Sequence, residues 1–501
     1  MSRILPDHPD LEHLKGQAKS LLRMLRDGDA TAAERCRSVG AEPGSRLADA
    51  QHVVAREYGF PSWSRLKAHV ESLTTNPADA FILAIKDNDA PGVEALLTAH
   101  PGLTAIVNRG TDQLGFGATP LIAAVQRSNR DMIDTLLAAG ADITVKSEWW
   151  AGGFSVLENA DARLVPFLLE RGAVLDATAA AKFGMVDRLA ELVAAEPKSV
   201  HARGGDGKTP LHWAGDVATA RFLVEHGADV NARDVDHEST PAQYMVRDRQ
   251  EIVRYLIDEG CVTDIFLAAA LGDLDLARRI LDADPAALEM AVNDESFPKH
   301  NPSAGGTIYI WTLGQGKTPH MVAQEFGRDD VFALLMSRSS DRLKLAQACV
   351  LGDEALFDRL LAAHPELTTG VPAGYRRQLL DAAVNNNTNA VRLLLRAGWP
   401  VDTRGPHGGT ALHWAAWHGN AAMLQEVLKY HPPLDLRDDA HHMPPIGWAM
   451  HGSLHGWHAS TGDFGGVVTA LIEAGAKTVD IMPTLEGSEA ALAALRIGRQ
   501  A

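Results

Sequence analysis

The sequence predicts an all-α protein, built as a solenoid of stacked helix pairs with a few inserts. Three observations carry this prediction. At 501 residues the chain is too long for one compact core, so several domains or an elongated repeat array is expected. One short skeleton of turn residues followed by two apolar helices recurs along the chain. A single copy cannot bury its own apolar face, so neighbouring copies must stack.

The clearest copies of the skeleton begin at Gly117, Gly207 and Gly408. They read GATPLIAAVQRSNRDMIDTLLAAGAD, GKTPLHWAGDVATARFLVEHGAD and GGTALHWAAWHGNAAMLQEVLKYHPPLD. The threonine near the start of each copy can cap a helix through its side chain, and proline at the first helical position loses no hydrogen bond. The glycine of HGAD or AGAD supplies the left-handed residue that ends the second helix.

These copies resemble the ankyrin repeat, a unit of about 33 residues with the pattern T-P-L-H-x-A. By this resemblance, to a multi-repeat protein of the bacterial type, about ten to twelve helix pairs lie between residues 81 and 480. The resemblance implies β-hairpin-like fingers and a concave groove lined by the fingers and the first helices. It also implies that His212 and His413 bond backbone groups of neighbouring repeats.

The chain divides into three predicted parts. Residues 1–75 show helical apolar spacing, and we predict a helical region there that caps the solenoid, because a terminal unit must cover one hydrophobic end. Residues 76–484 form the predicted solenoid, and residues 485–501 a C-terminal cap or tail. Inserts interrupt the solenoid near residues 145–155, 293–314 and 453–463. The second insert contains TIYIW, whose β-branched and aromatic residues favour a strand.

Composition narrows the classes of partner. The net charge of −17 repels phosphate backbones, so we expect no nucleic-acid partner. No apolar run approaches the ~18 residues that a membrane span needs, and the N-terminus does not have the pattern of a secretory signal, so we expect a cytoplasmic protein without membrane contact. The three cysteines are far apart in sequence and offer no disulfide framework or metal spacing. We expect no cofactor.

The ankyrin resemblance assigns particular side chains to the groove, at the finger tips and before the glycine between the two helices. Together with tryptophans on the inserts they form the predicted binding set: Trp149, Trp150, Asp236, His237, Tyr244, Trp311, Lys317, His407, Trp417, His418, His441, His451 and Trp457. Convergence on one enclosed pocket of about 300 to 1,000 Å³ would indicate a small-molecule ligand, and scatter along an open groove a protein partner. Four other tryptophans are interpreted as packing between helices: Trp213, Trp399, Trp414 and Trp448.

The histidine-rich segment near the C-terminus could be interpreted as a metal site. His451, His455 and His458 have the spacing of one helical face and could supply metal ligands. Gly452 and Gly456 interrupt this run and make a continuous helix doubtful. We therefore predict no metal site and keep the three histidines as weak candidates.

Two functions remain open. The first is a binding module that recognises a protein or small-molecule partner in the concave groove. The second is an enzyme of the hydrolase or lyase class, acting on a small polar or aromatic substrate in a histidine-rich pocket, with histidine moving a proton. The candidate catalytic residues for the second function are His451, His418, Asp236 and Glu325.

Overall fold

A computed structural model describes residues 11–39, 46–63, 65–67, 76–405, 407–478 and 486–497. The predicted all-α class is confirmed, because these residues contain no β-strand and a single isolated bridge, between Thr111 and Ala118. The chain divides into two units, Met1–Ala179 with Gly204–Asp206, and Ala180–Arg203 with Gly207–Ala501.

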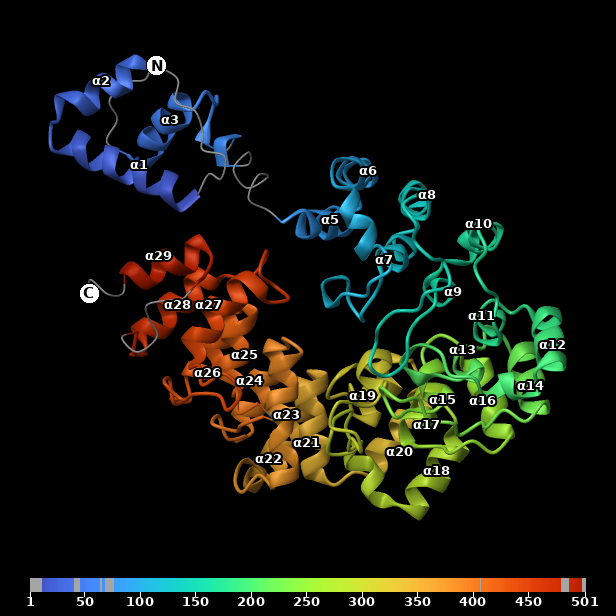
Figure 1. The fold of residues 1–501 in the computed structure, drawn as a ribbon. Coiled ribbons are helices and arrows are strands. Elements are labelled where there is room, and N and C mark those ends of the chain that lie inside the picture. The colour runs from blue at the N-terminus through green and yellow to red at the C-terminus, as the bar shows by residue number, and fades with distance from the viewer. Residues whose placement is uncertain are drawn as a thin grey trace. The chain divides into compact units, whose positions relative to one another are not determined.

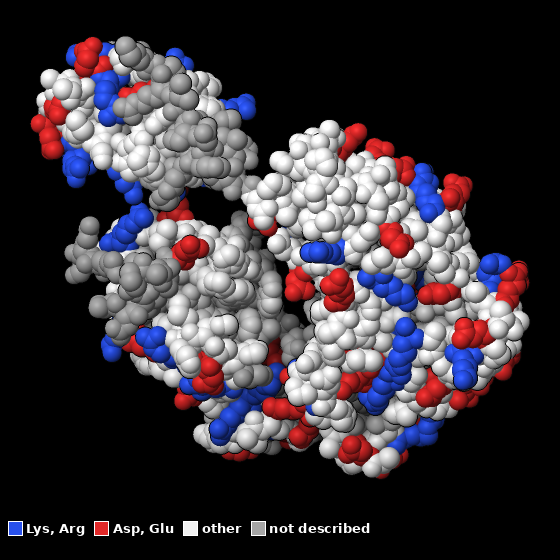
Figure 2. Space-filling view, viewed as in Figure 1, with Lys and Arg blue, Asp and Glu red and all other residues white. Residues whose placement is uncertain are grey.

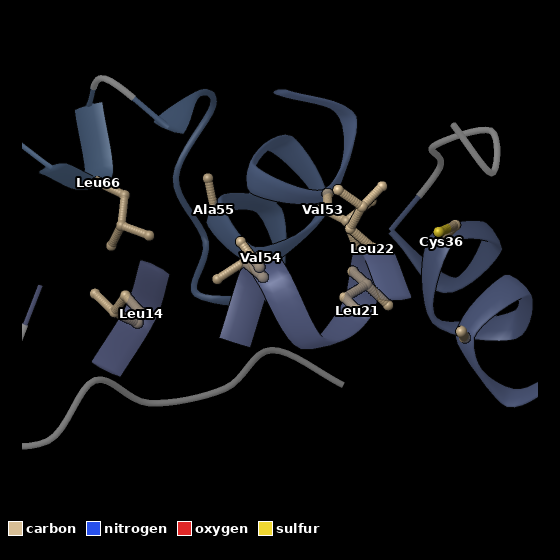
Figure 3. Packing of buried hydrophobic residues seen from close by; sticks show 11 residues of the cluster. Leu14, Leu21, Leu22, Cys36, Val53, Val54, Ala55 and Leu66 are labelled. Atoms are coloured by element: carbon tan, nitrogen blue, oxygen red, sulfur yellow. The ribbon is translucent and has the colours of Figure 1, made fainter. Parts of the chain in front are cut away.

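Three N-terminal helices bury a hydrophobic cluster of their own (Figure 3). They are α1 (Leu11–Arg26), α2 (Ala30–Ser38) and α3 (Leu47–Glu57). Leu14, Leu21, Val53 and Leu66 are fully or almost fully buried in this cluster. Parts of the predicted 1–75 region lie outside the described residues, namely 1–10, 40–45, 64 and 68–75. That this region caps the solenoid stays a prediction.

The rest of the first unit consists of short helices joined by turns. They are α5 (Pro77–Lys86), α6 (Ala90–Ala99), α7 (Pro120–Gln126), α8 (Arg130–Ala138), α9 (Val156–Asn159), α10 (Val165–Glu170) and the start of α11 (Ala177–Lys182). Within this unit α5 packs on α7, and α6 packs on α8. First helices therefore stack on first helices and second helices on second helices, as a repeat array requires.

The second unit continues the same pattern over many helix pairs, which Figure 1 shows following one another in chain order. Its helices are α12 (Val186–Ala195), α13 (Pro210–Trp213), α14 (Val217–Glu225), α15 (Pro241–Met245), α16 (Gln250–Asp258), α17 (Ile265–Leu271), α18 (Leu274–Ala283), α19 (Pro319–Glu325), α20 (Asp329–Arg338), α21 (Asp341–Leu351), α22 (Glu354–Ala363), α23 (Ala373–Val384), α24 (Thr388–Arg396), α25 (Ala411–His418), α26 (Ala421–Leu428), α27 (Pro445–His455), α28 (Phe464–Glu473) and α29 (Glu489–Ile497). Near its C-terminal end, α25 packs on α23 and α27, and α26 on α24 and α28. Of the predicted C-terminal cap or tail, residues 485 and 498–501 lie outside the described residues.

The threonine and histidine of the repeat motif cap the first helices. The Nδ1 atoms of His212 and His413 each lie 3.1 Å from the backbone nitrogen three residues earlier, and accept its hydrogen bond. The other ring nitrogen of His212 lies 3.1 Å from the carbonyl oxygen of Ser239 in the next repeat. The repeat at Thr240 replaces this histidine by Gln243, whose side-chain oxygen accepts the Thr240 N–H at 2.9 Å.

These capping histidines predict a loss of stability in mild acid. Burial lowers the pKa of His212 to about 3 and that of His413 to about 4. A histidine whose pKa falls on folding stabilises the protein above its unfolded pKa of about 6.5, and this contribution is lost as the pH falls from there towards the folded pKa. We expect each to cost about 2 kcal/mol of unfolding free energy between pH 7.5 and pH 5. Urea unfolding at the two pH values checks this.

The matched control for this prediction is the double substitution H212Q and H413Q. Glutamine already performs the capping role at Gln243 and does not titrate in this range. The double variant should therefore stay folded and lose much less stability between pH 7.5 and pH 5. An unchanged pH dependence in the variant would contradict the assignment.

The face of the molecule in Figure 2 shows acidic and basic side chains interspersed rather than gathered by sign. No helix among the described residues is both long enough and apolar enough to cross a membrane.

Candidate functional site

A cavity of about 450 Å³ opens in the C-terminal repeats of the second unit. Its walls come from helices α25 and α27, from the finger that precedes each of them and from the link that follows α27. The lining residues are His407, Trp414, Trp417, His441, Met443, Gly447, Trp448, His451 and Trp457. We call this cavity the aromatic pocket, because four of its lining residues are tryptophans.

The four indole rings of the aromatic pocket face one another at several angles. Trp414 and Trp448 meet edge to face, with ring centroids 5.2 Å apart and planes 81° apart. Trp457 stacks nearly parallel to Trp414 at 6.1 Å and lies perpendicular to Trp417 at 6.4 Å. Faces and edges from different directions thus enclose one space, which is the geometry of an aromatic box.

Close packing of α25 against α27 brings the rings together. Trp414 and Trp417 are three residues apart on α25 and so lie on one face of that helix. Helix α27 runs unbroken from Pro445 to His455, so the doubt about helical continuity at Gly452 was wrong. A Cβ atom on Gly452 would lie 2.5 Å from the carbonyl oxygen of Trp417. Glycine serves here to let two helix backbones approach, and it does not interrupt α27.

Asp438 fixes the finger that carries one wall. This buried carboxylate accepts hydrogen bonds from the backbone N–H groups of Ala440, His441 and Met443, at 2.6 to 2.9 Å. It also accepts the indole N–H of Trp448 at 2.9 Å. Burial opposes ionisation, but these hydrogen bonds outweigh it and lower the pKa of Asp438 to about 2. The charged aspartate therefore holds Trp448 in place at neutral pH.

Three predicted histidines, His407, His441 and His451, stand at the exposed edge of the pocket. The ring of His451 lies 5.7 Å from that of Trp417, at 31° to it. Burial, with the nearby His455 and His441, lowers the pKa of His451. The edge of the pocket is therefore neutral at His451 and can offer ring nitrogens for hydrogen bonding.

His418 is a structural residue and does not line the pocket. It is buried, and its Nε2 atom lies 3.0 Å from the carbonyl oxygen of Val384 in the preceding repeat. Burial lowers its pKa. Its ring packs 5.7 Å from Trp457, behind the pocket wall. His418 therefore packs against a tryptophan that lines the pocket.

The weak metal candidates do not meet at one point. His451 and His455 are neighbours on α27, with ring centroids 4.6 Å apart. His458 follows the helix and packs 5.2 Å from His418 instead. The described residues contain no group of three or more histidine, cysteine or acidic side chains placed to hold a metal ion.

The structure places three other predicted residues beneath the 293–314 insert. The side chain of Asp236 accepts the N–H of Gly305 at 3.2 Å, and the Nδ1 atom of His237 lies 2.9 Å from the carbonyl oxygen of Gly306. Tyr244 donates its hydroxyl to Asp234 at 2.9 Å. The first two contacts fasten the insert to the finger that carries Asp236 and His237, and the third holds Tyr244 to the same finger.

The same insert does not form the strand that TIYIW favours. Residues Ile310–Gly314 form one π-helical turn. Tyr309 is fully buried, and its hydroxyl donates to the partly buried carboxylate of Asp264 at 2.9 Å. The burial and hydrogen bond of this tyrosine determine the local backbone conformation more strongly than the β-propensity of the segment does.

The remaining predicted residues are not among those that line the aromatic pocket. Glu325 accepts hydrogen bonds from Lys317 at 2.8 Å and from Arg247 at 2.7 Å. Burial works against ionisation of Glu325, but these two partners lower its pKa. Trp311 is 74% exposed. In the first unit, Trp149 packs on Phe116 with centroids 5.0 Å apart, and Trp150 beside it is partly exposed.

Four of the residues that line the pocket are absent from the predicted binding set: Trp414, Met443, Gly447 and Trp448. Trp414 and Trp448 are the two aromatic residues among them. Both were interpreted as packing between helices, and Trp399, in the same group, is indeed buried. The available signal was their spacing: Trp414 and Trp417 occupy one helical face, and the Pro-Pro-x-x-Trp of the next repeat places Trp448 opposite them.

Comparison with known proteins finds ankyrin repeats in three segments. Family models match residues 177–267 (ankyrin repeats, 3 copies), 379–425 (ankyrin repeats, many copies) and 116–148 (ankyrin repeat). The second match includes α25 and ends before α27. The half of the aromatic pocket built by α27 and its link therefore lies beyond the matched residues.

Similar curated proteins align with limited parts of the chain. Ankyrin repeat and SAM domain-containing protein 6 of Mus musculus is 33% identical over 136 residues, 25% of this chain and 15% of that protein. Palmitoyltransferase akr1 of Schizosaccharomyces pombe is 40% identical over 65 residues, 12% of this chain and 10% of that protein. Ankyrin repeat domain-containing protein SAT10 of Stachybotrys chartarum is 23% identical over 254 residues, 49% of this chain and 11% of that protein. The alignments thus span a small fraction of each relative.

Proposed function

This chain is an ankyrin-repeat protein, and we propose that it is a binding module whose recognition site is the aromatic pocket between α25 and α27. Only five of the thirteen predicted binding residues line this pocket, and its wall at Trp457 is 67% exposed, so the convergence on an enclosed pocket that would indicate a small-molecule ligand is not met. Ankyrin repeats are protein-interaction modules, so we take a protein as the partner. Apart from Trp457, the lining residues come from two first helices and the two fingers that precede them, which are the elements that the resemblance assigns to the groove. A cytoplasmic location fits this proposal and stays a prediction.

The observation that carries the proposal is the exposure of Trp457 to solvent. This indole is 67% exposed while it forms one wall of a cavity with three other tryptophans. Exposed aromatic side chains around a concavity are characteristic of interaction sites, where tryptophan contributes large binding energies. Covering these rings with a partner would remove apolar surface from water.

The enzyme alternative has less support. His451 stands at the pocket edge, but His418 is held behind the wall by its contact with Val384. Asp236 and Glu325 are bonded to other parts of the fold. None of the lining residues is a carboxylate, so the pocket does not pair a histidine with an acidic group as acid–base catalysis by such a pair would need. We therefore favour binding over catalysis.

The partner test compares Trp457→Ala with the matched control Trp311→Ala. Both indoles are highly exposed, at 67% and 74%, and the second lies outside the pocket. A partner captured by the wild-type protein and then purified should bind W457A about tenfold or more weakly, because tryptophan hot spots commonly cost 2 kcal/mol or more. It should bind W311A normally. Calorimetric titration measures both, and equal binding of wild type and W457A would refute the proposal.

A further inference from the structure

The aromatic pocket repeats an arrangement found earlier in the second unit. Aligning the T-x-L-H motifs places Trp414 on Trp213. In the next repeats, aligning Thr240 with Pro444 places Trp448 on Tyr244. In the earlier pair of repeats, the ring of Tyr244 stands 5.3 Å from the capping His212, at 85°. In the later pair, Trp448 stands 5.3 Å from the equivalent histidine, at 75°. The two sites therefore share one aromatic geometry.

The supporting carboxylates correspond as well. Asp234 accepts the hydroxyl of Tyr244 at 2.9 Å, and Asp438 accepts the indole N–H of Trp448 at 2.9 Å. Each aspartate begins a finger in which its own N–H bonds the carbonyl five residues later, at 3.1 and 3.0 Å. Equivalent fingers thus present equivalent aromatic side chains.

The two sites differ at the residue before the capping threonine. In the earlier site this residue is Lys208, which is buried. Its ammonium group lies 3.9 Å from the ring centroid of Trp213 and 5.3 Å from that of Tyr244. The space between these aromatic positions therefore holds an alkylammonium cation supplied by the chain itself.

In the later site the equivalent residue is Gly409, which brings no side chain. Trp414 and Trp448, which replace Trp213 and Tyr244, line the open aromatic pocket instead. Two further indoles enlarge it: Trp417, where the earlier repeat has Asp216, and Trp457 from the insert. Indole faces attract cations more strongly than other aromatic faces.

The lining also indicates which kind of cation fits. An unmodified ammonium carries three N–H donors that need acceptors, and no carboxylate lines the pocket. A trimethylated ammonium has no N–H to satisfy, and its methyl groups pack on indole faces. The chain's net charge of −17 would also attract a cationic partner.

We propose that the aromatic pocket binds a methylated lysine side chain of the protein partner, with its quaternary ammonium among Trp414, Trp417 and Trp448, and with Trp457 closing the box. This inference rests on the proposed function of the pocket as a recognition site. The partner's lysine would take the place that Lys208 takes in the earlier repeats.

The test titrates the full chain with small probes by calorimetry. N-acetyl-trimethyllysine methylamide is compared with its carbon isostere, in which a tert-butyl group replaces the quaternary ammonium. The two have nearly the same shape and differ in charge, so we expect the trimethyllysine probe to bind about tenfold or more tightly. Equal or tighter binding of the isostere, or no saturable binding of the trimethyllysine probe, would overturn the inference.

Two further probes test whether methylation of the ammonium group is required and whether the ligand is a protein side chain or a free small molecule. The unmodified lysine probe should bind several-fold more weakly than the trimethylated one, because its three N–H donors would leave water for a lining that contains no carboxylate. Equal binding would overturn the preference for methylation. Choline carries the same head group without the lysine stem, and binding as tight as that of the trimethyllysine probe would overturn the assignment to a protein side chain in favour of a free small molecule.

Gly409→Lys recreates the earlier site and should abolish binding of the trimethyllysine probe by filling the pocket from within. A Cβ atom at position 409 would lie 3.1 Å from Trp448, so W457A, which alters an exposed side chain, provides an independent loss of binding if G409K fails to fold. W311A should bind as wild type does. Unchanged probe binding in a folded G409K and in W457A would overturn the inference.

The partner titration tests the proposed function separately, since it does not depend on which group of the partner enters the pocket.

Discussion

Replacing Gly452 by alanine is expected to lower the free energy of unfolding of the C-terminal repeats by about 3 kcal/mol or more. The added Cβ atom would lie 2.5 Å from the backbone oxygen of Trp417, a contact that side-chain rotation cannot relieve. Helices α25 and α27 would have to separate, although they pack closely along their length. Urea unfolding followed by tryptophan fluorescence measures the loss.

Gly374→Ala is the matched control for this substitution. Gly374 lies in helix α23, and a Cβ atom there meets no atom within 4 Å. Alanine should leave the stability unchanged or raise it by up to about 1 kcal/mol, because the unfolded chain loses conformational freedom. If G452A and G374A proved equally stable, the close approach of α25 and α27 would be disproved.

Asp438→Ala is the second substitution with a large expected effect. It removes the acceptor of three backbone N–H groups and of the Trp448 indole. Buried donors left without a partner are costly, and we expect a loss of about 3 kcal/mol. The rim of the pocket should also loosen, so trimethyllysine binding should weaken in the fraction that stays folded. Thermal unfolding and calorimetric titration check the two effects.

The neighbouring Asp439→Ala provides the comparison. Asp439 is exposed and pairs with Arg404 on the surface, and such pairs contribute roughly 0 to 1 kcal/mol. A pH scan distinguishes the two aspartates further. The pKa of Asp438 falls to about 2 on folding, so its contribution is present above the unfolded pKa near 3.9 and is lost as the pH falls below it. Equal losses for D438A and D439A would contradict this role.

Much of the fold could be predicted because residues within each repeat mark where its helices begin and end. Thr119 caps α7 and Thr318 caps α19 through their side chains, with proline next to each. Such local hydrogen-bonding rules operate within four residues of sequence. The bond from His212 to a backbone group of the next repeat was predicted from the ankyrin resemblance and is present, whereas the capping by His212 and His413 within their own repeats was not predicted.

The inserts were harder because distant contacts decide their structure. TIYIW has β-propensity, but burial of Tyr309 against Asp264 determines its conformation. Asp236 and His237 occupy finger positions that would face a groove, yet the 293–314 insert uses them as anchors. Nothing local to these residues signals a partner almost seventy positions away.

The candidate site was predicted in part for a similar reason. His407, His441, His451, Trp417 and Trp457 do converge on one pocket, because finger tips and first helices repeat at fixed positions. Trp414 looked like a core residue, since the ankyrin pattern leaves little free space after its histidine. The link after α27 folds back and stacks Trp457 on Trp414 at 6.1 Å. Trp414 therefore lines the pocket instead of packing between helices.

The most direct test of the account is a titration of the indole N–H signals by nuclear magnetic resonance. The chain has ten tryptophans, which can be assigned by single substitutions with phenylalanine. On addition of N-acetyl-trimethyllysine methylamide, the signals of Trp414, Trp417, Trp448 and Trp457 should shift together, while those of Trp150 and Trp311 stay in place. Shifts confined to Trp150 or Trp311, or no shift among the four pocket indoles at saturating probe, would contradict the claim that the aromatic pocket recognises a methylated ammonium group.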